Sequence, residues 1–151
     1  MLQLARIQDR EAVDALALQA HKLHVQWRPD LYETVDVLYP PERFEMAVKQ
    51  RQLYVAKIDE IVVGYVSLLE RNCDWPGAVK RRIMIIDEFC VHESCRGQGI
   101  GKAMMADVRA LAQAFGFTDL QLGVYPQNDD AVGFYQKCGF TIRSIEMQRK
   151  V

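Results

Sequence analysis

The sequence has no excess of charge of either sign. It carries 19 Lys and Arg residues against 20 Asp and Glu residues, for a formal net charge of -1. Proteins that bind nucleic acids or anionic membranes usually carry a pronounced basic surface. The balance of charges therefore predicts that neither nucleic acid nor a membrane surface is a partner.

Long apolar runs are absent as well. No stretch approaches the ~18 consecutive apolar residues of a membrane-spanning helix, and residues 1–6 lack the basic and apolar regions of a signal peptide. We therefore expect a cytoplasmic protein. Because the chain has 151 residues and 50% of them are hydrophobic, it is long enough to bury a proper core, and we expect a single domain over residues 1–151.

Cysteine and histidine are too scattered to indicate a metal site. The four cysteines contain no C-x-x-C pair, and the three histidines do not have the spacing of zinc ligands. We therefore expect no metal, and we expect free thiols in core or loop positions. The cysteines are Cys73, Cys90, Cys95 and Cys138.

Hydrophobic periodicity predicts a mixed order of strands and helices rather than a plain alternation. Asp9 is expected to cap the first helix, Pro40 and Pro41 to begin the second, and Gly139 to end the last. The expected strands are residues 2–7, 52–58, 61–69, 82–91, 118–124 and 140–148, and the expected helices are residues 9–25, 99–115 and 130–138, with one more helix after Pro40.

The turn between the strand at 82–91 and the helix at 99–115 has the composition of an anion-binding site. Gly97, Gly99 and Gly101 alternate there, between Arg96 and Lys102. Glycines let the backbone turn sharply and approach a ligand, and the N-terminus of the following helix attracts negative charge. The spacing fits neither a P-loop nor a Rossmann fingerprint. We interpret the turn as a cradle for phosphate or pyrophosphate; the alternative is a tight glycine turn without a ligand.

Two segments of the chain resemble the GNAT superfamily of acyltransferases. Residues 96–101 are similar to its [Q/R]-x-x-G-x-[G/A] signature, and residues 128–140 to its N-x-x-A-x-x-x-Y-x-x-x-G-F segment, in the family's order. The resemblance covers roughly residues 1–148. It implies an α/β (α+β) GNAT-like domain with a central, mostly antiparallel twisted sheet, a splayed strand pair and about four flanking helices.

The resemblance also implies an activity. Members of the family transfer an acetyl group from acetyl-CoA, a co-substrate, to a primary amine of a small molecule or peptide by direct attack in a ternary complex. An alternative is a non-catalytic module of the same fold that senses acyl-CoA or binds a partner. Many members are dimers, so a homodimer is compatible with the resemblance. The cofactor-binding residues that it implies are Phe89, Cys90, Val91, Arg96, Gly97, Gln98, Gly99, Ile100, Gly101, Lys102, Asn128 and Tyr135.

Tyr135 is the candidate general acid. The resemblance places this tyrosine beside the sulfur of coenzyme A, and a phenol with a reference pKa of ~10 is protonated at neutral pH and can donate to a departing thiolate. The alternative is a core aromatic residue. The N–H of Val91 is the candidate donor to the oxyanion. Asn128 is expected to contact the pantetheine arm, to cap the helix at 130–138, or both.

The candidate general base is Glu88, with Asp87 as the second choice. Adjacent strand residues normally face opposite sides of a sheet, so only one of them should face the site unless a β-bulge intervenes. The alternative is a carboxylate that merely pairs with Arg81 or Arg82.

The acceptor is expected to contact the first two helices and the loop between them. There Trp27 and Tyr32 are the candidate substrate-binding residues, with Tyr39 as a third member of an aromatic wall. Acidic residues in the same stretch favour a cationic amine, although a solvated loop face is an equal alternative. These acidic residues are Asp30, Glu33 and Asp36.

Overall fold

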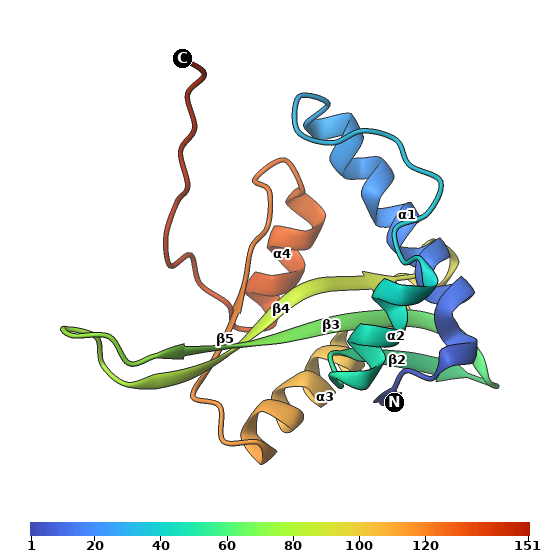
Figure 1. Ribbon diagram of the computed structural model, residues 1–151, viewed down its shortest axis with the longest axis horizontal. Helices are drawn as coiled ribbons and strands as arrows, with labels where there is room; N and C mark the ends of the chain where they lie inside the picture. The colour runs from blue at the N-terminus through green and yellow to red at the C-terminus, as the bar shows by residue number, and fades with distance from the viewer.

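The chain folds around one twisted five-stranded sheet, seen in the computed structural model, which describes all residues 1–151 (Figure 1). The strand order is β1-β2-β3-β4-β5; the first three pairings are antiparallel, and β4 pairs with β5 in parallel. The strands are β1 (Leu2–Leu4), β2 (Leu53–Ile58), β3 (Ile61–Cys73), β4 (Arg81–Val91) and β5 (Asp119–Leu122).

Helices cover both faces of this sheet. Helices α1 (Arg10–Trp27) and α2 (Pro41–Lys49) pack on one face, and α3 (Ile100–Ala114) packs on the other. Helix α4 (Asp129–Lys137) follows β5, and the short 3-10 helices η1 (Ile7–Asp9) and η2 (Glu93–Cys95) precede α1 and α3. None of the helices is both long enough and apolar enough to cross a bilayer. The expected fold class, a mostly antiparallel α/β sheet with four flanking helices, is confirmed.

Side-chain alternation along the strands produces two hydrophobic cores. Val55 and Tyr65 pack with Phe44 in the cluster under α1 and α2, whereas Val66 and Met84 pack in the cluster under α3. Successive strand residues point to opposite faces, so each central strand contributes to both cores. We call the two sides of the sheet the α1–α2 face and the α3 face.

Asp9 has a different role from the one predicted. It occupies the N-cap position of α1, but its side chain makes no capping hydrogen bond. Its carboxylate instead accepts a hydrogen bond from the Arg6 N–H, at 2.8 Å, and lies 2.8 Å from the Lys57 ammonium, with exposed fractions of 5% and 6% for the two side chains. Charges at this depth are stable only when they are paired. Asp9 therefore fastens η1 to β2.

The last predicted strand, residues 140–148, is wrong. The structure contains no strand after α4, and the chain beyond Phe140 is extended, leaving the body of the molecule and ending away from the sheet (Figure 1). Strand-forming side chains express a preference for a half-buried, paired surface. In the single chain these residues have no neighbouring strand to supply that surface.

Candidate functional site

The site begins where β4 and β5 separate. The two strands pair only from Ile83 with Asp119 to Ile86 with Leu122, whereas β4 continues to Val91. This splay leaves the outer side of the last residues of β4 without a strand partner. The N–H and C=O groups on that side have no partner in a neighbouring strand.

The backbone of Val91 faces this open side. The His92 N–H donates to the Val63 carbonyl at 2.8 Å, which makes Gly64 and Val91 a non-hydrogen-bonded pair of the antiparallel ladder. The N–H and C=O of Val91 therefore point away from β3, and by the two-residue repeat so do those of Phe89. The Val91 carbonyl accepts hydrogen bonds from Gln19 Nε2 and Arg96 Nε, both at 3.3 Å.

Gln19, which no sequence pattern singled out, joins α1 to this region. Its amide nitrogen donates to the Val91 carbonyl at 3.3 Å, and its amide oxygen accepts from the Glu93 N–H at 3.1 Å. The side chain thus links α1 to the end of β4 and the start of η2. The contact lies more than 70 positions away along the chain, where no local pattern could reveal it.

The glycine turn has the backbone conformation of a ligand cradle. Gly97 and Gly99 have φ values of +74° and +81°, a left-handed region that favours glycine. Gly99 is the N-cap of α3 and supplies no capping side chain, so the first amides of α3 have no side-chain acceptor. A Cβ atom at Gly97 or Gly99 would meet nothing within 4 Å. The free amides, the helix N-terminus and the open space fit a phosphate group.

The remaining cradle residues differ in what their side chains do. Arg96 and Lys102 are exposed at the mouth of the turn, as predicted from their charge. Gln98 donates to the Ser94 carbonyl at 3.1 Å. Ile100 is the first residue of α3 and its side chain is buried, so only its backbone is available. A Cβ at Gly101 would lie 3.4 Å from the Phe134 ring, so this glycine allows α4 to approach α3 closely.

A β-bulge brings Asp87 and Glu88 to the same face. Ser67 pairs with Glu88 and the next residue, Leu68, pairs with Ile86, which leaves Asp87 as the extra residue of β4. Glu88 bonds to Tyr39 and Tyr65 of the α1–α2 face, and Asp87 lines a cavity on that same face. The structure therefore contains the β-bulge that was considered from sequence, and this bulge presents both carboxylates on one face.

Glu88 is held by two buried phenols and a guanidinium. It accepts hydrogen bonds from the Tyr39 hydroxyl and, at 3.1 Å, from the Tyr65 hydroxyl; Arg43 Nη2 lies 3.5 Å from it. Burial, followed by the charge of Glu88, raises the pKa of both tyrosines well above the usual value, so they remain donors. The pairing with Arg81 or Arg82 considered from sequence is wrong, because these arginines pair with Asp119 and Glu70.

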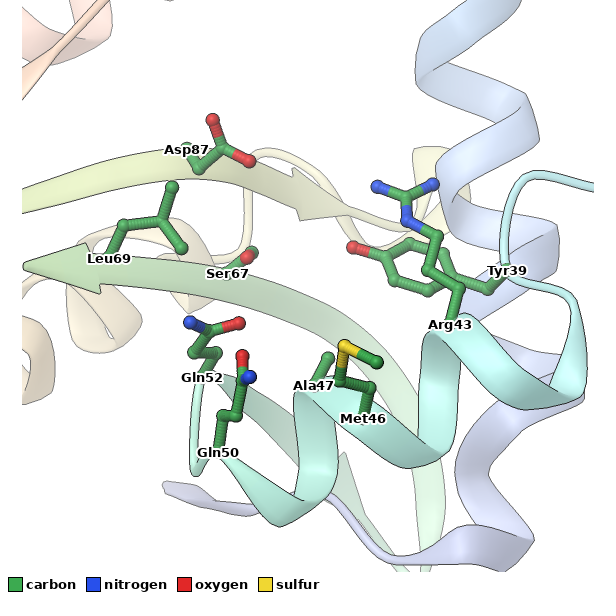
Figure 2. Close-up of a pocket in the computed structure, with 9 residues that line it drawn as sticks. All are labelled: Tyr39, Arg43, Met46, Ala47, Gln50, Gln52, Ser67, Leu69 and Asp87. Carbon is green, nitrogen blue, oxygen red and sulfur yellow. The ribbon is translucent and has the colours of Figure 1, made fainter.

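Asp87 is exposed and forms no ion pair. It stands at the rim of a cavity of about 170 Å³ between α2 and strands β3 and β4 (Figure 2). The walls combine hydrogen-bonding side chains with apolar ones, so the cavity suits a polar ligand of modest size. The lining residues are Tyr39, Arg43, Met46, Ala47, Gln50, Gln52, Ser67, Leu69 and Asp87.

Tyr135 approaches the splay from the other side of the sheet. Its ring lies 6.3 Å from that of Phe89 and 5.8 Å from that of Phe140, and it packs on the cluster of the α3 face. Burial, followed by the nearby thiols of Cys90 and Cys138, raises its pKa to about 12. Tyr135 is thus part of an aromatic cluster, which is the alternative considered from sequence, and its raised pKa also keeps it a proton donor at neutral pH.

Trp27 and Tyr32 gather around a histidine at the end of α1. The His24 ring lies 5.3 Å from Tyr32, 5.7 Å from Tyr125 and 5.9 Å from Trp27, and the hydroxyls of Tyr32 and Tyr125 are 2.7 Å apart. Burial is the main cause of the lowered pKa of His24, and the charge of Glu88 opposes it. His24 and Tyr125 are additions to the predicted set. Tyr39 is not part of this wall, because it is buried with Glu88.

Asn128 caps α4. Its side-chain oxygen accepts a hydrogen bond from the Ala131 N–H at 3.2 Å, which is the capping role considered from sequence. The cap fixes the first turn of the helix that carries Tyr135. Its predicted contact with a cofactor stays a prediction.

The chain is similar to known acetyltransferases in sequence. Residues 18–140 match the family model described as "Acetyltransferase (GNAT) family". The chain is 29% identical over 131 residues to the peptidyl-lysine N-acetyltransferase YjaB of Salmonella typhimurium, covering 82% of this chain and 78% of that protein. It is 29% identical over 93 residues to the uncharacterized N-acetyltransferase MJ1207 of Methanocaldococcus jannaschii, covering 61% of this chain, and it spans only 40% of that protein.

A solved structure is similar over the whole length. A mutant of the BH1408 protein from Bacillus halodurans superposes with a TM-score of 0.92 at 28% sequence identity, covering 100% of this chain and 99% of that one.

Proposed function

Because this chain belongs to the GNAT family of acetyltransferases, we propose that it transfers the acetyl group of acetyl-CoA to a primary amine of a small molecule or peptide. The observation that carries this proposal is the splay of β4 and β5, bordered by the glycine cradle, with two carboxylates on one face of the sheet and a protonated tyrosine on the other. Base and acid therefore approach the reacting carbon from opposite sides in a direct attack within a ternary complex.

Acetyl-CoA would bind chiefly through backbone groups. The amides from Gly97 to Lys102 and the N-terminus of α3 are suited to the pyrophosphate, with Arg96 and Lys102 adding positive charge. The outward N–H and C=O groups of Phe89 are suited to the amides of the pantetheine arm, which would pair with them as an added strand does; the Val91 carbonyl already accepts hydrogen bonds from Gln19 and Arg96. The Val91 N–H is then placed to stabilise the developing oxyanion.

Glu88 would accept the proton of the attacking amine, directly or through a water molecule. The hydrogen bonds from Tyr39 and Tyr65 fix its carboxylate, and Arg43 stabilises its negative charge. Asp87, which has no cation partner of its own, would attract a protonated amine to the same face. Tyr135 would donate its proton to the thiolate that leaves, since its raised pKa keeps the phenol protonated at neutral pH.

The acceptor would lie on the α1–α2 face. The cavity beside Asp87 offers amide, hydroxyl and carboxylate groups, and the cluster of His24, Trp27, Tyr32 and Tyr125 offers aromatic surface at the end of α1. The similarity to a peptidyl-lysine N-acetyltransferase supports an aliphatic primary amine as the attacking group.

The test is acceptor-dependent release of coenzyme A, followed with a thiol reagent. Acetyl-CoA is offered with polyamines, aminoglycosides, amino acids and lysine peptides, and the protein's own thiols are blanked because Cys95 and Cys138 are only half-buried. We expect release with one class of amine. A parallel thermal shift separates binding from turnover, because a ligand at ~100 times its Kd stabilises a fold by ~2.7 kcal/mol. Binding of acetyl-CoA without release for any amine would contradict the proposed activity and favour the sensor.

A further inference from the structure

The cavity beside Asp87 contains a buried hydroxyl that the proposed transfer does not use. Ser67 of β3 is only 7% exposed, lines this cavity, and forms no side-chain hydrogen bond within the chain. A polar side chain at this depth normally has a hydrogen-bond partner. Figure 2 shows Ser67 between Asp87 of β4 and the side of the cavity that Tyr39 and Arg43 form. The hydroxyl is therefore placed to bind a ligand inside the cavity.

Two amides share the cavity with Ser67. Gln50 follows α2 and Gln52 precedes β2, and neither side chain forms a hydrogen bond with another residue, although both line the same cavity. Asp87 adds a carboxylate without an ion-pair partner. A few polar groups that converge on a partly apolar wall are typical of a site for a small molecule.

Arg43 is the one cation of the cavity wall, and contacts with α2 and the preceding loop hold it in place. Its guanidinium stacks on the Tyr39 ring, 4.1 Å from the centroid, and donates to the Leu38 carbonyl. Its Nη2 lies 3.5 Å from the Glu88 carboxylate. A guanidinium has five N–H donors, so the other three are free to donate to a ligand. A guanidinium with free donors in one plane is suited to a carboxylate.

Arg43 and Glu88 thus present opposite charges side by side. An α-amino acid carries its ammonium and its carboxylate on the same carbon atom, and this arrangement is complementary to the pair. A diamine or the side chain of a peptide lysine has no anion to offer to Arg43. If the carboxylate of an amino acid lies on Arg43, its side chain can extend past Ser67 toward Asp87, at the opposite end of the cavity (Figure 2).

We propose that the acceptor is a free α-amino acid whose side chain carries a hydrogen-bond donor, an inference that rests on the proposed acetyl transfer. Arg43 would bind the α-carboxylate, and Ser67 and Asp87 would accept hydrogen bonds from the side chain. The α-nitrogen, beside Glu88, would attack the thioester carbon, so that a C–N bond forms as the C–S bond breaks. The ammonium loses two protons overall; one ends on the thiol of coenzyme A and the other in solvent.

The test compares acceptors that differ in a single group. Release of coenzyme A by the full chain is measured with L-amino acids that carry amide, hydroxyl or cationic side chains, each beside its own α-carboxamide, and with L-glutamate. We expect one of these donor-bearing amino acids to exceed its carboxamide, which lacks the anion, at least ~10-fold in kcat/KM, the scale of one charge-assisted hydrogen bond. L-glutamate should be a poor acceptor, because its side chain repels Asp87.

Two variants assign the preference to residues. Arg43→Gln should lower the ratio of kcat/KM between amino acid and carboxamide about 10-fold, whereas an effect through Glu88 alone would lower kcat equally for both. The matched control is Arg109→Gln, which removes the same charge from an exposed position of α3 and should keep the ratio. Ser67→Ala should raise the KM of the preferred amino acid about 2–10-fold and leave the ratio unchanged.

Other results overturn the inference in distinguishable ways. If polyamines, aminoglycosides or lysine peptides accept the acetyl group and amino acids do not, the transfer stands and the acceptor class is wrong. If amino acid and carboxamide react equally, or if their ratio survives Arg43→Gln, then Arg43 does not bind the carboxylate. If acetyl-CoA binds but no amine of any class accepts the acetyl group, the proposed transfer fails and the inference fails with it.

Discussion

The two sides of the candidate site are built in different ways. The proposed cofactor side is one continuous stretch, from Phe89 to Lys102, and it would act mainly through backbone groups that belong to a strand, a glycine turn and a helix. The proposed acceptor side is assembled from α1, α2, β3, β4 and the segment after β5, and it would act through side chains. Binding of the cofactor should therefore be lost through one local change. Binding and turnover of the acceptor should instead decrease in smaller, separable steps.

The largest expected effect is the loss of acetyl-CoA binding in Gly99→Arg. The side chain would enter the open space in front of α3, and φ of +81° disfavours any residue with a Cβ. Calorimetry should detect no binding by the folded variant. Gly77→Arg is the matched control, because Gly77 has φ of +85° and open surroundings in the β3–β4 loop. If the two variants bind equally well, the cradle is misplaced.

Tyr135→Phe should come next, because it removes the proton donor without altering the cradle. We expect kcat to fall by about 10²–10⁴-fold, the scale of a lost general acid, with little change in the Kd of acetyl-CoA. The control is Tyr54→Phe, on β2 in the same hydrophobic cluster, which should keep its kcat. An unchanged kcat in Tyr135→Phe would remove this residue from the chemistry.

Substitutions of the two carboxylates should change different kinetic parameters. Glu88→Gln should lower kcat by about 10²-fold, the lower end of the range for a general base. Asp87→Asn should mainly raise the KM of a cationic acceptor, by up to about fivefold, the scale of one exposed ion pair. Initial rates over acceptor concentration distinguish the two. A larger fall in kcat for Asp87→Asn would exchange the roles.

The smallest expected effect concerns the pH dependence of stability. Burial lowers the pKa of His24 in the folded state, so the unfolded chain binds the proton first, near pH 6.5. Below that pH this residue destabilises the fold, and above it the penalty disappears. Urea unfolding between pH 7.5 and 5.5 should show a smaller loss of stability in His24→Gln than in the wild type. An equal or larger loss would contradict a half-buried His24 that stays neutral in the fold.

The contrast between the continuous cofactor side and the assembled acceptor side also explains which features could be predicted from sequence. The cradle could be located because Gly97, Gly99 and the start of α3 are neighbours in the chain, and local geometry fixes their conformation. The mixed α/β class followed from the order of periodic segments, and the splayed, mostly antiparallel sheet followed from the resemblance to the GNAT family. By contrast, Tyr32 meets Tyr125 across 93 positions, and Tyr39 meets Glu88 across 49. Such contacts depend on how helices pack, which no local pattern encodes.

Two further differences have the same origin. The bulge at Asp87 is a property of the pairing between β3 and β4. The sequence of β4 alone therefore could not decide whether Asp87, Glu88 or both face the site. The final strand was predicted from side chains that do favour strands, but a strand needs a neighbour, and the single chain provides none for residues 140–148. Asp9 was expected as a cap, but a buried Lys57 from β2 binds it instead.

The bulge makes Asp87 an insertion in an otherwise regular ladder. If Asp87 were deleted, Ile86 could still pair with Leu68 and Glu88 with Ser67, and the side chains of β4 would alternate without interruption. One carboxylate of the α1–α2 face can therefore be gained or lost through a single-codon insertion or deletion, without a shift in the register of Phe89 and Val91. The charge on the proposed acceptor side can in this way diversify while the backbone edge proposed for the cofactor is inherited unchanged.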